Sequence, residues 1–432
     1  MKVTEIDLTA YDKCIVALEK IREHRMSTGP IVKGEELYYT LLIQLFREVR
    51  QAWDEGKPFF LYEMSVPAEL FVGMGVPAME YDMICGSMTT LLRAHEAVYG
   101  AALKIGVREE ICSAQRTPIG ILAKGWFPKP AGIVYTNLDQ CDNCAQSANI
   151  LGEIYDVPTY FLNRPMRWWS ERGVKMMTGE FEDAVAFLEE RTGRKMDWNK
   201  LKEAIAISVE QVKLIREIHE LIMAKPCPVR ARAASFAHWI RWSYAGRQEG
   251  LDYFRAFRDE VKALADQGKG AVPNERFRLM SLFTPPQNQM KMLDWLEHDK
   301  GVALVAEPYY FRVGPWDMDP SKPLESLARQ YYHESYYRFY SQMEEYLDMI
   351  VQDAKESGAQ AALNWFNSKC RMGGAMSKIV KDTLAEKVGI PTLTVDVDLL
   401  DPSPASEKRT KERIEGFLES ISIGAAGTAS AA

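Results

Sequence analysis

The chain has 432 residues, of which 47% are hydrophobic and 26% are charged, a balance typical of a soluble globular protein with two or three domains. Its net charge of −7 argues against nucleic acid as the main partner, because nucleic-acid-binding domains usually carry a basic surface. No apolar run reaches the roughly 18–20 residues that span a bilayer, and the first residues lack the layout of a signal peptide. We therefore expect a cytoplasmic protein that binds neither nucleic acid nor a membrane.

The first part of the chain predicts helices and then a parallel sheet. Residues 1–57 form an N-terminal helical segment, because apolar residues recur at three- and four-residue spacing through 5–56. After it, short apolar runs alternate with helical patterns. Strands are predicted at 59–63, 132–136 and 159–163, and helices at 86–106 and 144–156. This βαβ alternation indicates a first α/β domain over 58–165.

The second part repeats the alternation after a helical stretch. Residues 166–272 contain long amphipathic helices and no strand, so they are interpreted as a helical insert. Strands are predicted at 277–283, 302–307, 361–366 and 392–398, with helices between them, which indicates a second α/β domain over 273–423. The small residues of 424–432 predict a flexible tail. The fold class is therefore α/β, with two parallel-sheet domains joined by the helical insert.

The seven cysteines are an odd number in a long chain without a signal peptide, which argues against a disulfide framework. Cys14, Cys85 and Cys227 are interpreted as small buried hydrophobic residues. The other four are Cys112, Cys141, Cys144 and Cys370, and they fall near predicted helix starts.

Three of these positions favour a metal or catalytic role. Cys112 opens a predicted helix, and Cys141 and Cys370 each lie between a predicted strand and a helix. Ligands of open α/β sheets collect at the carboxyl ends of strands, and helix N-termini favour thiolates. Three thiolates with one open position suit an iron–sulfur cluster. A catalytic zinc with three protein ligands is the competing interpretation.

The C-x-x-C formed by Cys141 and Cys144 has two further interpretations. A zinc ribbon is disfavoured, because no second C-x-x-C follows downstream. A thioredoxin-like redox pair needs a βαβ context, which is partly present here. From spacing alone, the cluster, the zinc site and the redox pair all stay open.

Several segments, in order, resemble the 2-hydroxyacyl-CoA dehydratase / benzoyl-CoA reductase family. They cover most of residues 58–420. The segments that carry the resemblance are "VPAELFVGMGVPAM" (66–79), "CSAQRTPIGILAKG" (112–125), "CDNCAQSANILGEIYDVPTYFLNRP" (141–165), "CRMGGAMSKIVKDTLAEKVGIPTLTVDVDLLDP" (370–402) and "RTKERIEGFLE" (409–419).

The resemblance implies two Rossmann-like domains and an iron–sulfur cluster held by three cysteines. Carried over by motif, the ligands are Cys112, Cys141 and Cys370, and the cluster is [4Fe-4S] or a larger double-cubane cluster. Cys144 is interpreted as a neighbour of the ligand Cys141. The family's spacing from this ligand to the next strand matches the count from Cys141 to Pro158, whereas the count from Cys144 is three residues short. The implied partners are an ATP-hydrolysing iron–sulfur activator protein and either a homologous cluster-bearing subunit or a second copy of this chain.

The resemblance implies an enzyme that acts on acyl-CoA or aryl-CoA thioesters by radical chemistry. An aryl-CoA reductase of the benzoyl type, giving a cyclic dienoyl-CoA, is favoured, because the run from Cys141 through "VPTYFL" shows no gap. The alternatives are a (R)-2-hydroxyacyl-CoA dehydratase, which eliminates water through a ketyl radical to give a 2-enoyl-CoA, and a homodimeric double-cubane reductase. A non-enzymatic partner subunit is disfavoured, because all three cysteines are present.

The candidate catalytic side chains are Glu63, Ser65 and Glu69, which flank the first strand–helix turn. Glu69 acts on substrate or caps the helix that begins after Pro67. Ser65 hydrogen-bonds a thioester carbonyl or serves as a helix N-cap. Arg116 either offers positive charge to a cluster or a CoA phosphate, or forms a surface ion pair. The sequence carries no P-loop, so ATP is expected to be used by a partner.

Overall fold

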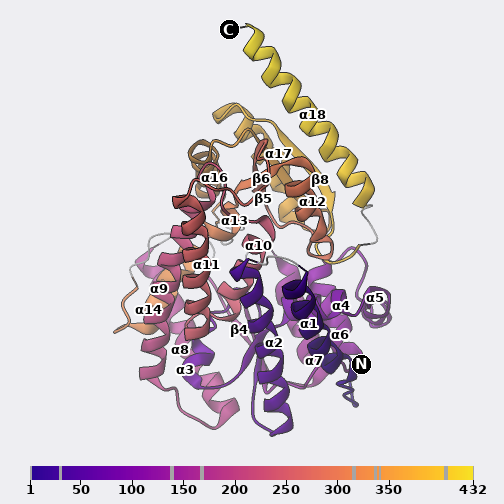
Figure 1. Cartoon of the computed structure of the whole chain (residues 1–432). Coiled ribbons are helices and arrows are strands. Elements are labelled where there is room, and N and C mark those ends of the chain that lie inside the picture. Colours follow the sequence, from indigo (N-terminus) through magenta and orange to yellow (C-terminus); the bar gives the residue numbers. More distant parts are fainter. Residues whose placement is uncertain are drawn as a thin grey trace. The chain divides into compact units, whose positions relative to one another are not determined.

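A computed structural model describes residues 2–28, 32–136, 141–165, 170–313, 318–334, 338–339, 342–402 and 407–431 (Figure 1). The chain forms two compact units. Unit 1 comprises Met1–Leu214, Phe236–Phe257 and Val313–Gln342, and unit 2 comprises Ile215–Ser235, Arg258–Arg312 and Met343–Ala432. Each unit is built around one four-stranded parallel sheet, which confirms the predicted α/β class with two Rossmann-like sheets.

The sheet of unit 1 has the strand order β2-β1-β3-β4. Its strands are β1 (Phe60–Tyr62), β2 (Ala78–Glu80), β3 (Gly132–Thr136) and β4 (Thr159–Leu162). The sequence predicted three of them, β1 from its apolar run after Pro58, and missed β2, whose residues Ala78–Glu80 form no apolar run. Phe60 contacts Phe71 and Phe187, so α3 (Glu69–Met74) and α8 (Glu171–Thr192) cover one face of this sheet, with α4, α6 and α7 on the other (Figure 1).

Outside the stretch 166–272, the other helices of unit 1 fall largely on predicted helical patterns, except the helix Pro323–His333, which the sequence did not predict. They are α1 (Thr9–Ser27), α2 (Lys33–Asp54), α4 (Tyr81–Leu91), α5 (His95–Lys104), α6 (Ser113–Ala123), α7 (Asp142–Tyr155) and α14 (Pro323–His333). The helix predicted at 86–106 is in fact two helices, α4 and α5, separated by a turn in which Arg93 has φ 52°. Helix α4 begins earlier than predicted because the Glu80 carboxylate accepts hydrogen bonds from the amides of Asp82 and Met83, at 2.9 and 2.8 Å.

The sheet of unit 2 has the order β6-β5-β7-β8. Its strands are β5 (Phe277–Leu282), β6 (Val302–Ala306), β7 (Ala361–Asn367) and β8 (Thr392–Val397), all predicted from the sequence. In each sheet, the second strand in sequence pairs with one side of the first strand, and the third strand pairs with its other side. The order reverses between β1 and β3, and between β5 and β7. Such reversal points are where open α/β sheets bind ligands, outside the carboxyl ends of the strands.

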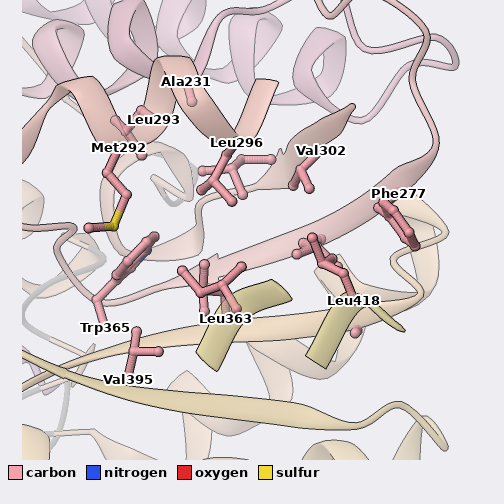
Figure 2. Packing of buried hydrophobic residues seen from close by; sticks show 14 of the residues in the cluster. Ala231, Phe277, Met292, Leu293, Leu296, Val302, Leu363, Trp365, Val395 and Leu418 are labelled. Atoms are coloured by element: carbon pink, nitrogen blue, oxygen red, sulfur yellow. The ribbon is translucent and has the colours of Figure 1, made fainter. Parts of the chain in front are cut away.

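The core of unit 2 follows from the period-2 geometry of a strand. Leu363 and Trp365 of β7 point to one face, where they pack with side chains of α12 (Lys291–Lys300) and α18 (Glu407–Ala431), including Leu296 and Leu418 (Figure 2). The intervening Asn364 points to the other face and donates from Nδ2 to Ser377 Oγ of α17 (Arg371–Lys387), at 3.2 Å. The strand is thereby buried between two helical layers.

The remaining helices of unit 2 are α13 (Pro308–Phe311) and α16 (Met343–Ser357), with a short 3-10 turn at Gln287–Gln289. Helix α18 continues to Ala431, through most of the segment 424–432 that the sequence indicated as a tail. Alanine is frequent there and has the highest helix propensity. The flexibility of this segment stays a prediction.

The helical stretch 166–272 contributes to both units. The divisions between the units fall inside α9 (Trp198–Ile222), α10 (Ala231–Ser243) and α11 (Gln248–Asp266). The separate insert domain and the boundaries drawn from the sequence stay predictions. Within the described ranges, no helix is both long and apolar enough to cross a bilayer.

Two helix-interior glycines of unit 1 give a matched test of the packing that supports Cys112. A Cβ on Gly120 of α6 would lie 2.1 Å from the carbonyl oxygen of Val98 in α5, whereas a Cβ on Gly100 of α5 would meet nothing within 4 Å. We expect Gly120→Ala to lower the free energy of unfolding by about 1–3 kcal/mol through overpacking. Gly100→Ala should raise it by about 0.5–1 kcal/mol through helix propensity. Urea unfolding measures both, and equal effects would contradict the close approach of α5 and α6.

Candidate functional site

The three cysteines predicted as cluster ligands share one local structure. Cys112, Cys141 and Cys370 are the N-cap residues of α6, α7 and α17. Cys141 follows β3 and Cys370 follows β7, so both lie beyond the third strand of their sheets, at the carboxyl edge. The Cys370 sulfur accepts a hydrogen bond from the amide of Gly373 at 3.3 Å. A helix N-terminus presents amide donors and partial positive charge, which stabilise a thiolate.

Exposure separates these three thiols from the other cysteines. Cys112, Cys141 and Cys370 are partly exposed, whereas Cys14, Cys85, Cys144 and Cys227 are buried, and none is in a disulfide. Burial raises the pKa of Cys14 and of Cys227 to about 12 and that of Cys85 well above its usual value. The buried thiols therefore stay protonated and cannot readily act as ligands. The partly exposed thiols have the donor chemistry that an iron–sulfur cluster needs.

Cys144 lies one helical turn inward from Cys141 and acts on it. Its thiol donates a hydrogen bond to the Cys141 sulfur across 3.3 Å, far beyond the length of a disulfide. That hydrogen bond and burial raise the pKa of Cys144 well above its usual range. Gln115 of α6 holds Cys144 from the other side, with Nε2 3.5 Å from the sulfur, and Ser147 in turn donates to the Gln115 carbonyl oxygen. Cys144 is thus a protonated donor to Cys141 rather than an equal partner of a redox pair.

Glu63 and Ser65 come together at the carboxyl end of β1. Glu63 follows the strand and is fully buried. Both the amide and the hydroxyl of Ser65 donate to Glu63 Oε2, the amide across 3.2 Å. Burial raises the pKa of Glu63 to about 7, although the Ser65 hydrogen bonds and the charge of Arg164 act in the opposite direction. Burial therefore favours the protonated form of this carboxyl.

Two more buried carboxyls, Glu80 and Asp82, follow the neighbouring strand β2. Burial raises the pKa of Glu80 to about 8 and that of Asp82 well above its usual value. The charge of Glu63 raises both pKa values further, and the charge of Glu80 also raises that of Asp82, whereas hydrogen bonds from the amides of Met83 and Asp82 act in the opposite direction on Glu80. The charges of Glu63 and Asp82 also contribute to the raised pKa of Cys144. The carboxyl ends of β1 and β2 thus hold a group of largely protonated acids beside the cysteine pair of α7.

Two arginines of unit 1 are buried, and one of them, Arg164, acts on Glu63. Arg164, which follows β4, is 1% exposed, and its guanidinium lies 5.1 Å from the ring centroid of Tyr331. Arg116 of α6 is 3% exposed and lies 4.3 Å from the centroid of Tyr99. The interpretation of Arg116 as a surface ion pair is therefore wrong, because the side chain is packed in the interior and stacked on an aromatic ring.

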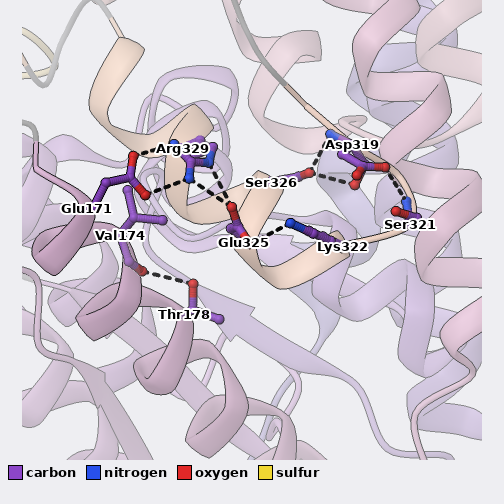
Figure 3. Close-up of polar contacts among 9 residues, drawn as sticks. All are labelled: Glu171, Val174, Thr178, Asp319, Ser321, Lys322, Glu325, Ser326 and Arg329. Atoms are coloured by element: carbon purple, nitrogen blue, oxygen red, sulfur yellow. Dashed lines mark hydrogen bonds and ion pairs between the residues drawn. The ribbon is translucent and has the colours of Figure 1, made fainter.

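Tyr331 reaches this site from α14, which an ion-pair network fastens to α8 (Figure 3). Arg329 of α14 makes two hydrogen bonds to Glu171 of α8, at 3.0 and 2.8 Å, and also bonds Glu325 one turn earlier. Burial raises the pKa of Tyr331, and the charges of Arg164 and Glu63 act on it in opposite directions. The tyrosine hydroxyl is therefore a neutral hydrogen-bonding group beside the acids.

Glu69 is placed differently from Glu63 and Ser65. It begins α3, is fully buried, and accepts a 2.6 Å hydrogen bond from Ser208 of α9. A Cβ on Gly246 would lie 2.8 Å from Glu69 Cγ, so the loop before α11 packs against it. Burial raises the pKa of Glu69. These contacts tie α3 to the surrounding helices, and a catalytic role for Glu69 stays a prediction.

The described residues contain no group of three or more His, Cys, Asp or Glu side chains arranged within metal-binding distance. Cys112 and Cys141 belong to unit 1, and Cys370 belongs to unit 2. Their shared N-cap position, partial exposure and lack of disulfides fit the donor set of a cluster. The assignment of the three as ligands stays a prediction.

Comparison with known proteins identifies the family. The family model of the 2-hydroxyglutaryl-CoA dehydratase D-component matches residues 63–421. The chain belongs to this family. A benzoyl-CoA reductase subunit of Thauera aromatica is 21% identical to it over 74% of the chain and 78% of that protein. The (R)-phenyllactyl-CoA dehydratase alpha subunit of Clostridium sporogenes is 23% identical over 73% and 78%. The lactoyl-CoA dehydratase alpha subunit of Anaerotignum propionicum is 24% identical over 91% and 98%.

The position of Glu63 and Ser65 at the first strand–helix turn marked them as candidates, but nothing in the sequence marked the groups around them. Glu80, Asp82, Gln115, Arg164 and Tyr331 come from separate elements, and no local pattern marks them. The sequence held one signal for Glu80. It precedes a helical pattern, and Asp82 follows two residues later, and acids at this position are typical of a helix N-terminus. Burial of the acids follows only from the sheet and its covering helices.

The raised pKa of Glu63 predicts how stability varies with pH. Because the folded-state pKa of about 7 lies above the ordinary 4.5, the unfolded state releases this proton first, so the group lowers stability as pH rises from 4.5 through 7. Glu63→Gln removes that term. From about pH 5 to pH 8, the unfolding free energy of the variant should rise relative to that of wild type by roughly 2–3 kcal/mol. Urea unfolding of both proteins at the two pH values measures this change.

Glu171→Gln is a control whose stability relative to wild type should change with pH in the opposite direction. Hydrogen bonds from Arg329 lower the pKa of Glu171, so this carboxylate stabilises the fold above its ordinary pKa and loses that effect as pH falls. The variant should therefore lose stability mainly at the higher pH. A Glu63→Gln variant whose pH dependence runs parallel to that of wild type would show that Glu63 does not carry the raised pKa.

Proposed function

We propose that this chain is the iron–sulfur subunit of an acyl-CoA radical enzyme, and that its reaction is the reduction of the aromatic ring of an aryl-CoA to a cyclic dienoyl-CoA. The family membership supports an enzyme subunit that acts on a CoA thioester. The proposed partners are a homologous subunit, since the relatives are themselves named as subunits, and an ATP-hydrolysing iron–sulfur activator. A second copy of the chain is the alternative to the homologous subunit.

The observation that carries the choice of ring reduction is the buried acid group at the carboxyl edge of unit 1. Ring reduction consumes two electrons and two protons, whereas elimination of water has no net demand for either. Glu63 and Glu80, with pKa values of about 7 and 8, hold protons at neutral pH without contact with bulk water. Such groups suit proton delivery to a radical anion in a site from which water is excluded.

The roles of the neighbouring side chains follow from their chemistry. Ser65 keeps Glu63 oriented through its hydroxyl and amide. Tyr331 and Arg164 offer a neutral donor and a positive charge for the thioester carbonyl as it gains electron density. Cys112, Cys141 and Cys370 would hold the cluster, either [4Fe-4S] or double-cubane, which supplies low-potential electrons when bound. Cys144 donates a hydrogen bond to Cys141 and so adjusts that ligand.

Dehydration of a (R)-2-hydroxyacyl-CoA to a 2-enoyl-CoA is the second candidate. The similarity to the lactoyl-CoA dehydratase alpha subunit favours it, because that match extends over 91% of this chain and 98% of the relative. The same acids would then serve to remove and return protons at the substrate carbons and at the leaving hydroxyl. A homodimeric double-cubane reductase is the third candidate, and iron per chain separates it from the other two.

Iron content tests the ligand assignment. Protein purified without oxygen should contain iron and acid-labile sulfide, with an electron paramagnetic resonance signal on reduction. Replacing Cys112, Cys141 or Cys370 by Ala should lower the affinity for iron by at least about tenfold, because each removes a thiolate from the ligand set. Unchanged iron in the triple variant would disprove the cluster assignment.

Cys144→Ser is the matched control for these variants. Cys144 is a buried thiol that donates to Cys141 and accepts from Gln115, and a serine hydroxyl can do both, so this replacement should leave iron and sulfide near the wild-type level. Cys144→Ala removes the hydrogen bond and should lower the reduction potential of the bound cluster, since donors to a ligand sulfur stabilise the reduced state. Loss of the cluster in Cys144→Ser would instead identify Cys144 as a ligand.

A substrate comparison decides between the two main candidates. The complete enzyme, with its partner subunit, activator and ATP, is assayed with benzoyl-CoA and with (R)-2-hydroxyacyl-CoA thioesters. Formation of a cyclic dienoyl-CoA supports ring reduction, and exclusive formation of 2-enoyl-CoA contradicts it. Glu63→Gln should lower kcat by about 10²–10⁴-fold if Glu63 delivers the proton. Ser65→Ala should lower kcat by less, because Ser65 acts only by orienting that carboxyl.

A further inference from the structure

Phe283 lies at the carboxyl end of β5 in unit 2, in a backbone conformation that is unusual for its residue type. It directly follows the strand and has φ 62°, in the left-handed region. The other non-glycine residues with positive φ in the described part of the chain are Arg93, Asp156 and Asn274, all of them polar. A bulky side chain makes this conformation costly, so the surrounding structure must hold Phe283 in it.

Aromatic packing holds the Phe283 side chain in place. Phe283 is 7% exposed, and its ring meets that of Tyr309 edge to face, with the centroids 5.4 Å apart. Tyr309 meets Tyr310 in the same way, at 5.1 Å. Both tyrosines belong to α13, which follows β6, the strand that pairs with β5. The three rings therefore form a packed row along the carboxyl ends of two neighbouring strands.

The Phe283 ring also faces the first turn of α17, whose N-cap is Cys370. A Cβ on Gly373 would lie 3.7 Å from Phe283 Cε1 and 3.5 Å from the Cys370 sulfur. The ring and the sulfur therefore both border the place where Gly373 lacks a side chain. The amide of Gly373 donates a hydrogen bond to the same sulfur, at 3.3 Å. Phe283 thus packs against the turn that presents Cys370.

The equivalent place in unit 1 is occupied by an acid. β1 and β5 are the first strands of their sheets, and Glu63 follows β1 as Phe283 follows β5. Glu63 is a hydrogen-bonding group held by Ser65, whereas Phe283 offers only hydrocarbon. An apolar shell beside a metal ligand controls how solvent reaches that ligand. This edge position therefore supplies a polar group in unit 1 and apolar cover in unit 2.

We propose that Phe283 is a positioning residue for Cys370, and that its ring holds the first turn of α17 and shields one side of the Cys370 sulfur from solvent. This inference rests on the proposed function, in which Cys370 is a cluster ligand. The left-handed backbone at Phe283 is the cost of directing the ring toward this turn. The shield would limit the access of water to Cys370 when the thiol is bound to iron.

Alkylation by iodoacetamide measures access to the Cys370 sulfur. The full chain is treated with a chelator so that its thiols are unligated, and peptide mass spectrometry follows Cys370 and Cys112 in the same sample. Phe283→Gly removes the ring and tolerates a positive φ, so Cys370 should react roughly tenfold faster than in wild type. Cys112 lies in unit 1 and should keep its wild-type rate.

Gly373→Ala should change the rate in the opposite direction. Its methyl group would occupy the space that the ring and the sulfur share, at ordinary contact distances from both. Cys370 should therefore react more slowly than in wild type. A general loosening of α17 would instead speed the reaction, so a slower reaction in this variant and a faster one in Phe283→Gly together identify shielding.

Two controls separate the ring from other effects of substitution. Phe283→Asn tolerates a positive φ without the flexibility of glycine, so it should speed alkylation of Cys370 as Phe283→Gly does. Phe366 of β7 packs against α17 at a different point, since a Cβ on Gly374 would lie 3.3 Å from its Cε2. Phe366→Leu should therefore leave the rate for Cys370 unchanged. Thermal unfolding confirms that each variant is folded.

The proposal is overturned if Cys370 reacts at the wild-type rate in both Phe283 variants, if Cys112 accelerates equally, or if Phe366→Leu has the same effect as Phe283→Gly. Alkylation needs no bound iron. A failure of the ligand assignment, seen as unchanged iron in the triple cysteine variant, is therefore observed separately from a failure of this inference.

Discussion

A parallel sheet forces every strand to end at the same edge, and the chain must leave that edge through a loop and a helix. In both units the third strand ends next to the point where strand order reverses, and the helix that follows begins at a cysteine. Cys141 and Cys370 therefore occupy equivalent places in two similar sheets. Their thiols sit at helix N-termini, where amide donors and the helix dipole favour negative sulfur. The remaining features of the site are arranged around this edge.

The acids at the edge of unit 1 are costly to bury, and the structure shows how that cost is reduced. Glu63 receives two hydrogen bonds from Ser65, and Glu80 receives two from the first amides of α4. These contacts favour the charged forms, yet burial dominates and raises both pKa values. A protein can lower this cost by keeping the proton, since an uncharged carboxyl is cheaper to bury. The result is a store of protons that bulk water does not reach.

The sequence was sufficient for much of this arrangement, for identifiable physical reasons. β3 and β7 are mostly apolar and almost wholly buried, as is typical of strands covered on both faces, and they predicted the positions of Cys141 and Cys370 after a strand. β2 was missed because Ala78–Glu80, unlike β1, form no apolar run, and Glu80 and Asp82 were therefore not recognised as residues at the end of a strand. Arg164 and Tyr331 meet Glu63 only through tertiary packing of α14 on α8. The C-x-x-C was ambiguous because spacing does not encode which sulfur is buried.

Helix geometry resolves that ambiguity. Residues three apart on a helix lie on the same side, so Cys144 follows Cys141 along one face of α7. The first sulfur is at the N-cap and partly exposed, whereas the second is one turn inward and buried against α6. A redox pair needs an accessible thiolate of lowered pKa to attack its partner. Here the inner thiol has a raised pKa and donates its hydrogen to the outer sulfur. The pair is thus one accessible sulfur and its hydrogen-bond donor, which suits a ligand and its supporting residue better than a disulfide.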